Sequence, residues 1–171
     1  MSEVNDINVF IYESISEIGE EDWEKCGKNI IGVRSIDPFT TYRFLKTLED
    51  SGSVGKGTGW SPRYLAAKVG DEVIGVTPMY IKSHSQGEYV FDHSWAHAYQ
   101  QAGGSYYPKI QIAAPFTPVT GSRFLVSEGY EKNGVSALIE TVKKLCSSNN
   151  ISGFHVTFCS ESEVSVGKEL G

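Results

Sequence analysis

The spacing of apolar side chains along the chain predicts alternating strands and helices. Residues 64–69 and 73–81 are rich in β-branched and aromatic side chains, and Gly70-Asp71 between them is typical of a tight hairpin turn. Between residues 129 and 147, apolar side chains recur three and four positions apart, which predicts a long helix. Similar patterns predict further strands over 8–15, 88–91, 110–114 and 154–158, and further helices over 20–26, 38–50, 92–101 and 160–170.

This order of elements predicts an α/β fold (α+β, with one mixed sheet) whose first half is largely antiparallel. A length of 171 residues fits a single domain spanning residues 1–171. Hydrophobic residues make up 40% and charged residues 21%, which is typical of a globular protein and excludes a disordered chain or a coiled coil. Two segments, 51–62 and 83–123, are read as polar and aromatic loop insertions into this domain.

Charge and cysteine content exclude several classes of partner. The net charge is −6, from 15 basic and 21 acidic residues, so we expect no duplex nucleic acid. No apolar run reaches the ~18 residues of a membrane span. The acidic, polar start of the chain is unlike a secretory or transit signal. Three cysteines without a CxxC pair indicate reduced thiols, and together these features predict a cytoplasmic protein.

Candidate chemistry concentrates between residues 80 and 123, where three of the four histidines lie. His93 and His97 are four residues apart, which is metal-ligand spacing on a helix. Ser94 stands where a zinc protease has its catalytic glutamate, so we expect no metal and interpret both histidines as surface or hydrogen-bonded side chains.

Other polar side chains of this region each allow two interpretations. Asp92 suits a general base or a ligand of a substrate ammonium, and equally a helix cap. Arg123 follows a Pro- and Thr-rich loop and suits a carboxylate or phosphate clamp, or a surface salt bridge. Tyr106 and Tyr107 suit hydroxyl donors or a stacking wall, or a buried core position.

The sequence resembles the FemAB-like predicted N-acyltransferases over nearly all of its length. The matching segments, in order, are DPF (37–39), SGSVGKGTGW (51–60), YIKSHS (80–85), GEYVFD (87–92), WA (95–96), YYPK (106–109) and PFTPVTG (115–121). The resemblance implies an acetyltransferase-like (GNAT) fold that full-length members use twice in tandem. It implies that this chain is the first such unit and that it is cut short at its C-terminus.

The resemblance also implies a reaction, in which an acceptor amine attacks an activated acyl carbonyl. The donor would be an acyl-CoA or an aminoacyl-tRNA, and the acceptor a small molecule or a peptidoglycan-type amine. A base and hydrogen-bond donors are needed for this chemistry. On this interpretation the catalytic residues are Asp92 and Tyr106, and the substrate-binding residues are His84, Trp95, Tyr107, Thr117, Thr120 and Arg123.

Two further expectations follow. The competing function is a non-catalytic half-domain that binds a peptide or glycan as part of a larger transferase. A last helix that stops at Leu170 would leave Val164 and Leu170 uncovered and the strand over 154–158 at an open edge. Because exposed apolar edges pair with what is near, we expect dimerisation through this C-terminal edge, giving a homodimer, or aggregation, in place of a clean monomer.

Overall fold

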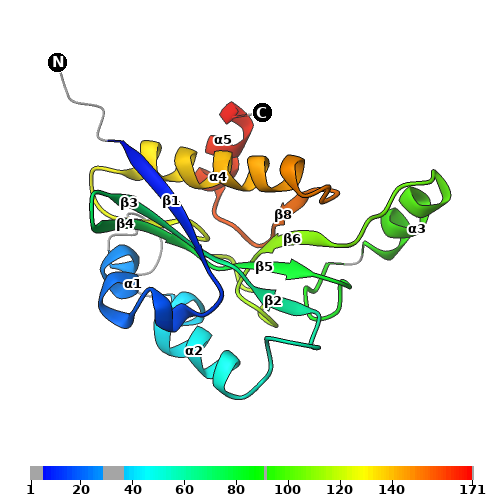
Figure 1. Cartoon of the computed structure of the whole chain (residues 1–171), viewed down its shortest axis with the longest axis horizontal. Coiled ribbons are helices and arrows are strands. Elements are labelled where there is room, and N and C mark those ends of the chain that lie inside the picture. Colours follow the sequence, from blue (N-terminus) through cyan, green and yellow to red (C-terminus); the bar gives the residue numbers. More distant parts are fainter. Residues whose placement is uncertain (1–5, 29–36, 91, 171) are drawn as a thin grey trace.

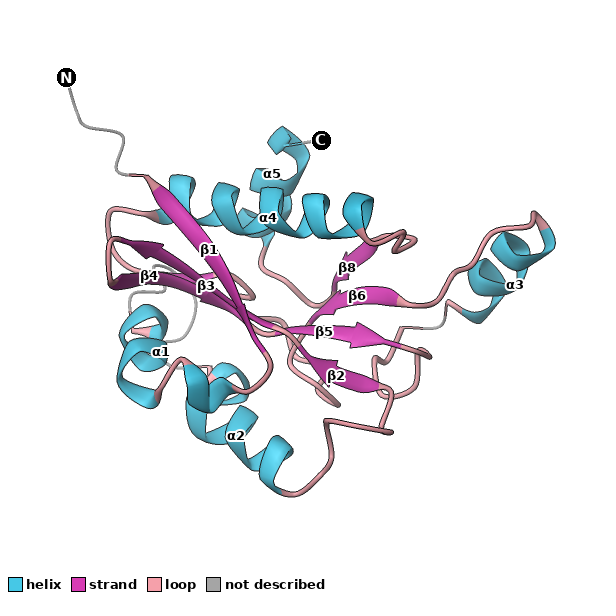
Figure 2. Ribbon diagram, viewed as in Figure 1, coloured by secondary structure: helices cyan, strands magenta, loops and turns pink. Residues whose placement is uncertain are grey.

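The structure, a computed structural model, describes residues 6–28, 37–90 and 92–170. Within these ranges two four-stranded sheets lie next to each other and five α-helices surround them (Figures 1 and 2). The strands are β1 (Ile7–Tyr12), β2 (Trp60–Pro62), β3 (Tyr64–Val69), β4 (Glu72–Thr77), β5 (Met79–Lys82), β6 (Lys109–Ile112), β7 (Leu125–Val126) and β8 (Phe154–Val156). The helices are α1 (Glu20–Gly27), α2 (Tyr42–Asp50), α3 (His93–Gln101), α4 (Glu131–Ser148) and α5 (Glu161–Leu170).

Strand pairing confirms the mixed α/β fold. The first sheet has the order β1-β3-β4-β7, and all of its pairs are antiparallel. The second sheet has the order β2-β5-β6-β8, in which only β6 and β8 run parallel. The predicted hairpin is β3–β4, which turns at Gly70 with a φ of 59°. That left-handed conformation is the one a glycine adopts without strain.

Helices cover both faces of the first sheet. The long helix α4 packs across β1, β3 and β4 on one face, while α1 and α2 lie on the other (Figure 1). One apolar core, around Trp23, Leu45 and Tyr64, fills the space beneath α1 and α2. A second core, around Leu138 and Ile112, lies beneath α4 and continues under the second sheet. Burial of these side chains is the main favourable contribution to the folded state.

Three elements predicted from the sequence have other boundaries in the structure. The strand expected over 73–81 is broken at Pro78, so β4 belongs to the first sheet and β5 to the second. The helix expected over 38–50 is a 3-10 turn at Pro38–Thr40 followed by α2, which Thr41 caps. The last residues of the loop predicted over 51–62 form a strand, β2. The short strand β7 was not predicted at all.

The strand predicted over 88–91 is wrong for residues 88–90, and residue 91 lies outside the described ranges. Glu88 turns inward and is 3% exposed, while Tyr89 has a φ of 56°, which no extended strand allows. The segment leads into α3, whose residues are all at least partly exposed and which projects away from both sheets (Figure 1).

The C-terminal helix α5 packs beside α4 and β8. Leu170 contacts the second core, so the expectation that it is uncovered is wrong. Val164 is 42% exposed, as expected for that side chain. Among the described strands, β8 pairs with β6 alone and forms one edge of the second sheet.

Candidate functional site

Strand alternation gives the second sheet one apolar face and one polar face. On β5 and β6, the residues Met79, Ile110 and Ile112 face the core beneath α4. The intervening positions place Lys82 opposite Lys109 and Tyr80 opposite Gln111 in the strand register. Because successive side chains of a strand point to opposite faces, these residues share the other side of the sheet.

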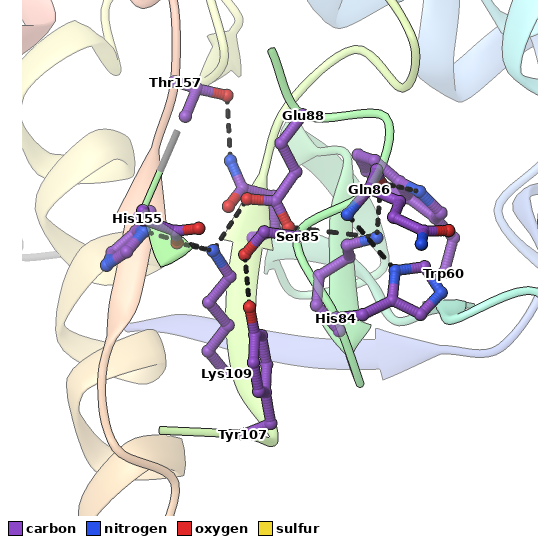
Figure 3. Close-up of polar contacts among 12 residues, drawn as sticks. Trp60, His84, Ser85, Gln86, Glu88, Tyr107, Lys109, His155 and Thr157 are labelled. Carbon is purple, nitrogen blue, oxygen red and sulfur yellow. Dashed lines mark hydrogen bonds and ion pairs between the residues drawn. The ribbon is translucent and has the colours of Figure 1, made fainter. Parts of the chain in front are cut away.

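Four charged side chains meet on this polar face, and we call them the charged cluster: Lys82, Glu88, Asp92 and Lys109. The Nζ atom of Lys109 donates to Glu88 Oε2 at 2.7 Å (Figure 3). It also donates to Asp92 Oδ2 at 2.6 Å. Lys82 Nζ lies 3.8 Å from Glu88 Oε1 and 3.6 Å from the centre of the Trp60 ring. All four side chains are 6% exposed or less, and their formal charges cancel.

Burial and pairing shift the pKa values within the charged cluster in different directions. Burial lowers the pKa of Lys82 to about 8, because Glu88 offsets only part of the lost hydration. Burial also raises the pKa of Glu88, against the hydrogen bond from Lys109. Burial opposes ionisation of Asp92, but hydrogen bonds from Lys109 and other donors outweigh it and lower the pKa of Asp92 to about 2. Asp92 is therefore a stable carboxylate and a weak base.

Three buried oxygen atoms at this face have no hydrogen-bond partner: Glu88 Oε1, Asp92 Oδ1 and Gln111 Oε1. Buried polar atoms normally form hydrogen bonds, so three buried oxygen atoms without one in the same site require an explanation. All three atoms are hydrogen-bond acceptors, so a group that pairs with them is a donor. Lys82 Nζ is 3.8 Å from Glu88 Oε1, and Ser85 contributes to lowering the pKa of Asp92. An ammonium or amine is a donor of this kind.

Two tyrosines separate the charged cluster from an open cavity. Tyr106 Oη donates to Asp92 Oδ2 at 2.7 Å, and Tyr107 Oη lies 2.6 Å from Ser85 Oγ. On their other side, both rings line a cavity of about 360 Å³ between α3 and the segment 104–107. Two histidines and four uncharged residues complete the lining: His93, Ala96, His97, Gln100, Gly104 and Ser105. The carboxylates of the charged cluster do not line this cavity, and the two tyrosines lie between them and it.

A histidine on β8 completes this face. His155 is paired with Gln111 in the register of β6 and β8, and its Nδ1 lies 3.5 Å from Lys109 Nζ (Figure 3). Its ring packs edge-on against Tyr106, with the centroids 6.1 Å apart. Burial and the neighbouring Lys109 cation lower the pKa of His155, so the imidazole is neutral at neutral pH.

The structure gathers some of the predicted site residues here and leaves others apart. Asp92, Tyr106 and Tyr107 meet at the charged cluster, and the Asp92 side chain makes no cap bond to α3. His84 lies beside the cluster without contacting its charged groups: Nδ1 accepts from the Gln86 backbone N–H, and Nε2 is 3.1 Å from the carbonyl oxygen of Thr58 (Figure 3). Trp95 is 74% exposed on α3 and does not line the cavity. The catalytic and substrate-binding roles given to these residues stay predictions.

The segment 115–123 occupies a different position. Thr117 donates to the Pro115 carbonyl, and Thr120 is exposed. Arg123 is fully buried, and its guanidinium donates to the carbonyl oxygens of Thr157 at 3.1 Å and Val119 at 2.6 Å. Arg123 therefore holds the segment against β8, and the structure lends no support to an anion clamp there.

Four residues of the site were not singled out from the sequence: Lys82, Glu88, Lys109 and His155. The signal that could have found the lysines is the alternation of polar and apolar residues in YIK (80–82) and KIQI (109–112). A lysine or glutamine at the inward positions of buried strands indicates a polar layer beneath the surface. Glu88 and His155 carry no comparable pattern.

The described residues include no group of three or more His, Cys, Asp or Glu side chains that could hold a metal ion. None of the described helices is both long and apolar enough to cross a bilayer.

Gly87 packs against the Phe116 ring, and this contact gives a stability prediction. Its φ is 79°, and an added Cβ would lie 2.6 Å from the Phe116 ring, which itself packs on Trp60. We expect Gly87→Ala to lower the free energy of unfolding by about 1–3 kcal/mol through overpacking, in addition to backbone strain. Gly103→Ala is the control, since Gly103 has a φ of 84° and open space at its Cβ. Equal losses in urea unfolding would show that the contact with Phe116 is unimportant.

Comparison with solved structures identifies the fold. A ribosomal-protein-alanine N-acetyltransferase from Brucella melitensis biovar Abortus 2308 superimposes with a TM-score of 0.55 at 9% identity, covering 97% of this chain and 91% of that one. An aminoglycoside acetyltransferase from an uncultured soil metagenomic sample gives 0.55 at 16% identity, with the same coverage. The aminoglycoside acetyltransferase AAC(6')-Iy, in complex with a bisubstrate analogue of CoA and acetylneamine, gives 0.52 at 15%, covering 97% and 90%. The chain therefore has the fold of the GNAT acetyltransferases.

The sequence then places the chain within a family. The FemAB-like family, described as peptidoglycan biosynthesis/recognition, matches residues 14–171. This chain belongs to the FemAB-like family. None of the curated proteins compared with it matches its sequence.

Proposed function

We propose that this chain is an N-acyltransferase-type domain that transfers an acyl or aminoacyl group to the amine of a peptidoglycan-type acceptor. The observation that carries the proposal is the pair of buried carboxylates, Glu88 and Asp92, each with one oxygen that has no donor. An acceptor ammonium supplies those donors and a positive charge. The FemAB-like family and the GNAT fold support the same reaction class.

The chemistry follows from the charges of the site. The charged cluster is neutral before a substrate enters, so an added ammonium is a net positive charge beside Lys109 and Lys82. Two nearby cations lower the pKa of that ammonium and favour loss of its proton. The freed amine then attacks the acyl carbon, and the bond to the donor's leaving group breaks. Tyr106 and Tyr107 line the cavity and orient the acceptor.

Acyl transfer to a defined amine tests the proposal. The full chain is incubated with a muropeptide bearing a free side-chain amine and with acetyl-CoA or alanyl-tRNA as donor, and the muropeptide mass is followed. We expect a mass increase at that amine, reduced about 100-fold or more in Asp92→Asn. A muropeptide whose amine is blocked is the control. Binding without transfer from either donor would instead identify the non-catalytic binding module.

The proposal also covers compartment and assembly. Three free cysteines support a cytoplasmic location. The edge strand β8, with Val164 exposed beside it, supports a homodimer formed by pairing of two such edges. We expect the sedimentation coefficient to rise with protein concentration, and we expect Val156→Pro, which removes an edge N–H, to abolish that rise. A monomer at all concentrations would contradict the homodimer.

A further inference from the structure

The polar face holds one titratable group that the proposed function leaves without a role. His155 lies on β8 at the end of the charged cluster, and Lys109 connects its ring to both carboxylates. Because a lysine only donates, the Nδ1 atom that faces Lys109 carries the lone pair and Nε2 carries the hydrogen. The contact is 3.5 Å long, so the lone pair is weakly engaged and available to another donor.

We propose that His155 is the general base that takes the proton from the acceptor ammonium. This inference rests on the proposed function and assigns a catalytic residue to the same site. The ammonium proton moves to Nδ1, and the freed lone pair of the amine forms the new C–N bond. The bond between the acyl carbon and the donor's leaving group breaks, and the imidazolium then returns its extra proton to solvent. His155 is half-buried.

The surroundings of His155 suit this role better than those of Asp92. Lys109 from β6, Asp92 at the start of α3 and Tyr106 from the preceding segment face the imidazole, and Glu88 lies beyond Lys109. Lys109 and burial keep the imidazole neutral and ready to accept a proton at neutral pH. Asp92, whose pKa is about 2, is already ionised and holds its charge too firmly to take one. The carboxylates therefore bind the ammonium, and the imidazole deprotonates it.

The test compares wild type with His155→Asn in the muropeptide transfer assay from pH 5 to 10. We expect the variant to lose about 100-fold or more in kcat/KM at neutral pH. We expect its rate to rise with pH, as free amine forms in solution, and to recover in part when imidazole is added. Lys144→Gln, an exposed change on α4, controls for general effects and should keep the wild-type profile. Histidine NMR of wild type should show one pKa below 6.5 that is absent from His155→Asn.

The outcomes separate the two proposals. A wild type that transfers the acyl group, together with a His155→Asn variant that keeps both rate and pH profile, overturns the base and leaves the transferase intact. An acid limb of the wild-type profile that is unchanged in His155→Asn would assign the proton to another group and overturn the base as well. A wild type that transfers nothing from either donor overturns the transferase, and the base with it.

Discussion

Replacing Lys109 with methionine should cause a large loss of stability. The substitution keeps the length of the side chain but leaves two buried carboxylates, those of Glu88 and Asp92, without their shared cation. Breaking a buried ion pair from one side typically costs about 3–5 kcal/mol, because the remaining charges stay in a poorly hydrated place. We expect a loss of that size in the free energy of unfolding at pH 7, measured by urea denaturation.

Two further variants make the Lys109 prediction falsifiable. Lys25→Met removes a solvent-exposed ion pair with Glu72, and we expect little change because exposed pairs contribute little to stability. Adding Asp92→Asn to Lys109→Met removes one of the stranded charges and should recover part of the stability. The interpretation fails if Lys109→Met is no less stable than Lys25→Met. A Lys109→Met chain that is already unfolded without urea agrees with it.

The second large effect is a rise in stability at alkaline pH that depends on Lys82. The folded chain lowers the pKa of Lys82 from 10.5 to about 8, so between these values the unfolded chain binds more protons than the folded chain. Stability therefore rises with pH across this window, and the penalty for burying the charged amine is fully present below pH 8. Urea unfolding at pH 7.5, 9 and 10.5 contains this contribution. Cys26, whose pKa burial raises to about 11, contributes with the opposite sign above pH 9, so the Lys82 contribution is isolated by comparison with a variant.

Lys82→Met provides the comparison. The variant has no amine that could lose a proton. The contribution of Lys82 to the pH dependence should therefore disappear, while those of the other titrating groups remain. The difference in unfolding free energy between wild type and variant should then move in favour of wild type from pH 8 to 10.5. Parallel curves for the two proteins across this window would mean that the Lys82 amine over Trp60 is not destabilised by burial.

Much of the fold could be predicted from local patterns. The hairpin at Gly70 and the long helix α4 depend on a turn signal and on helical spacing, and both are present in the structure. The break at Pro78 was missed, although a proline cannot donate within a sheet. Which sheet each half joins depends on pairing with distant strands, and spacing within one segment does not determine that.

The site could be predicted only in part, for a related reason. Asp92 and the two tyrosines stood out because they lie in a polar, aromatic segment. Lys109 and His155 are 46 positions apart in the sequence and meet because β6 and β8 run parallel in one register. The sequence pattern assigned Glu88 to a strand. In the structure the segment is irregular, and the Glu88 carboxylate pairs with Lys82 and Lys109. Long-range pairing therefore forms the site, and local pattern does not reveal it.

The most direct test of the central claim is calorimetric titration of the chain with two muropeptides, one with a free side-chain amine and one with that amine acetylated. No acyl donor is needed, so the measurement reports on the acceptor site alone. The buried carboxylates predict binding of the free amine, loss of that binding in the Glu88→Gln/Asp92→Asn double variant, and at least tenfold weaker binding of the acetylated form, roughly 1.4 kcal/mol. Equal affinity for the two muropeptides, or full affinity in the double variant, would contradict the claim that Glu88 and Asp92 receive the acceptor amine.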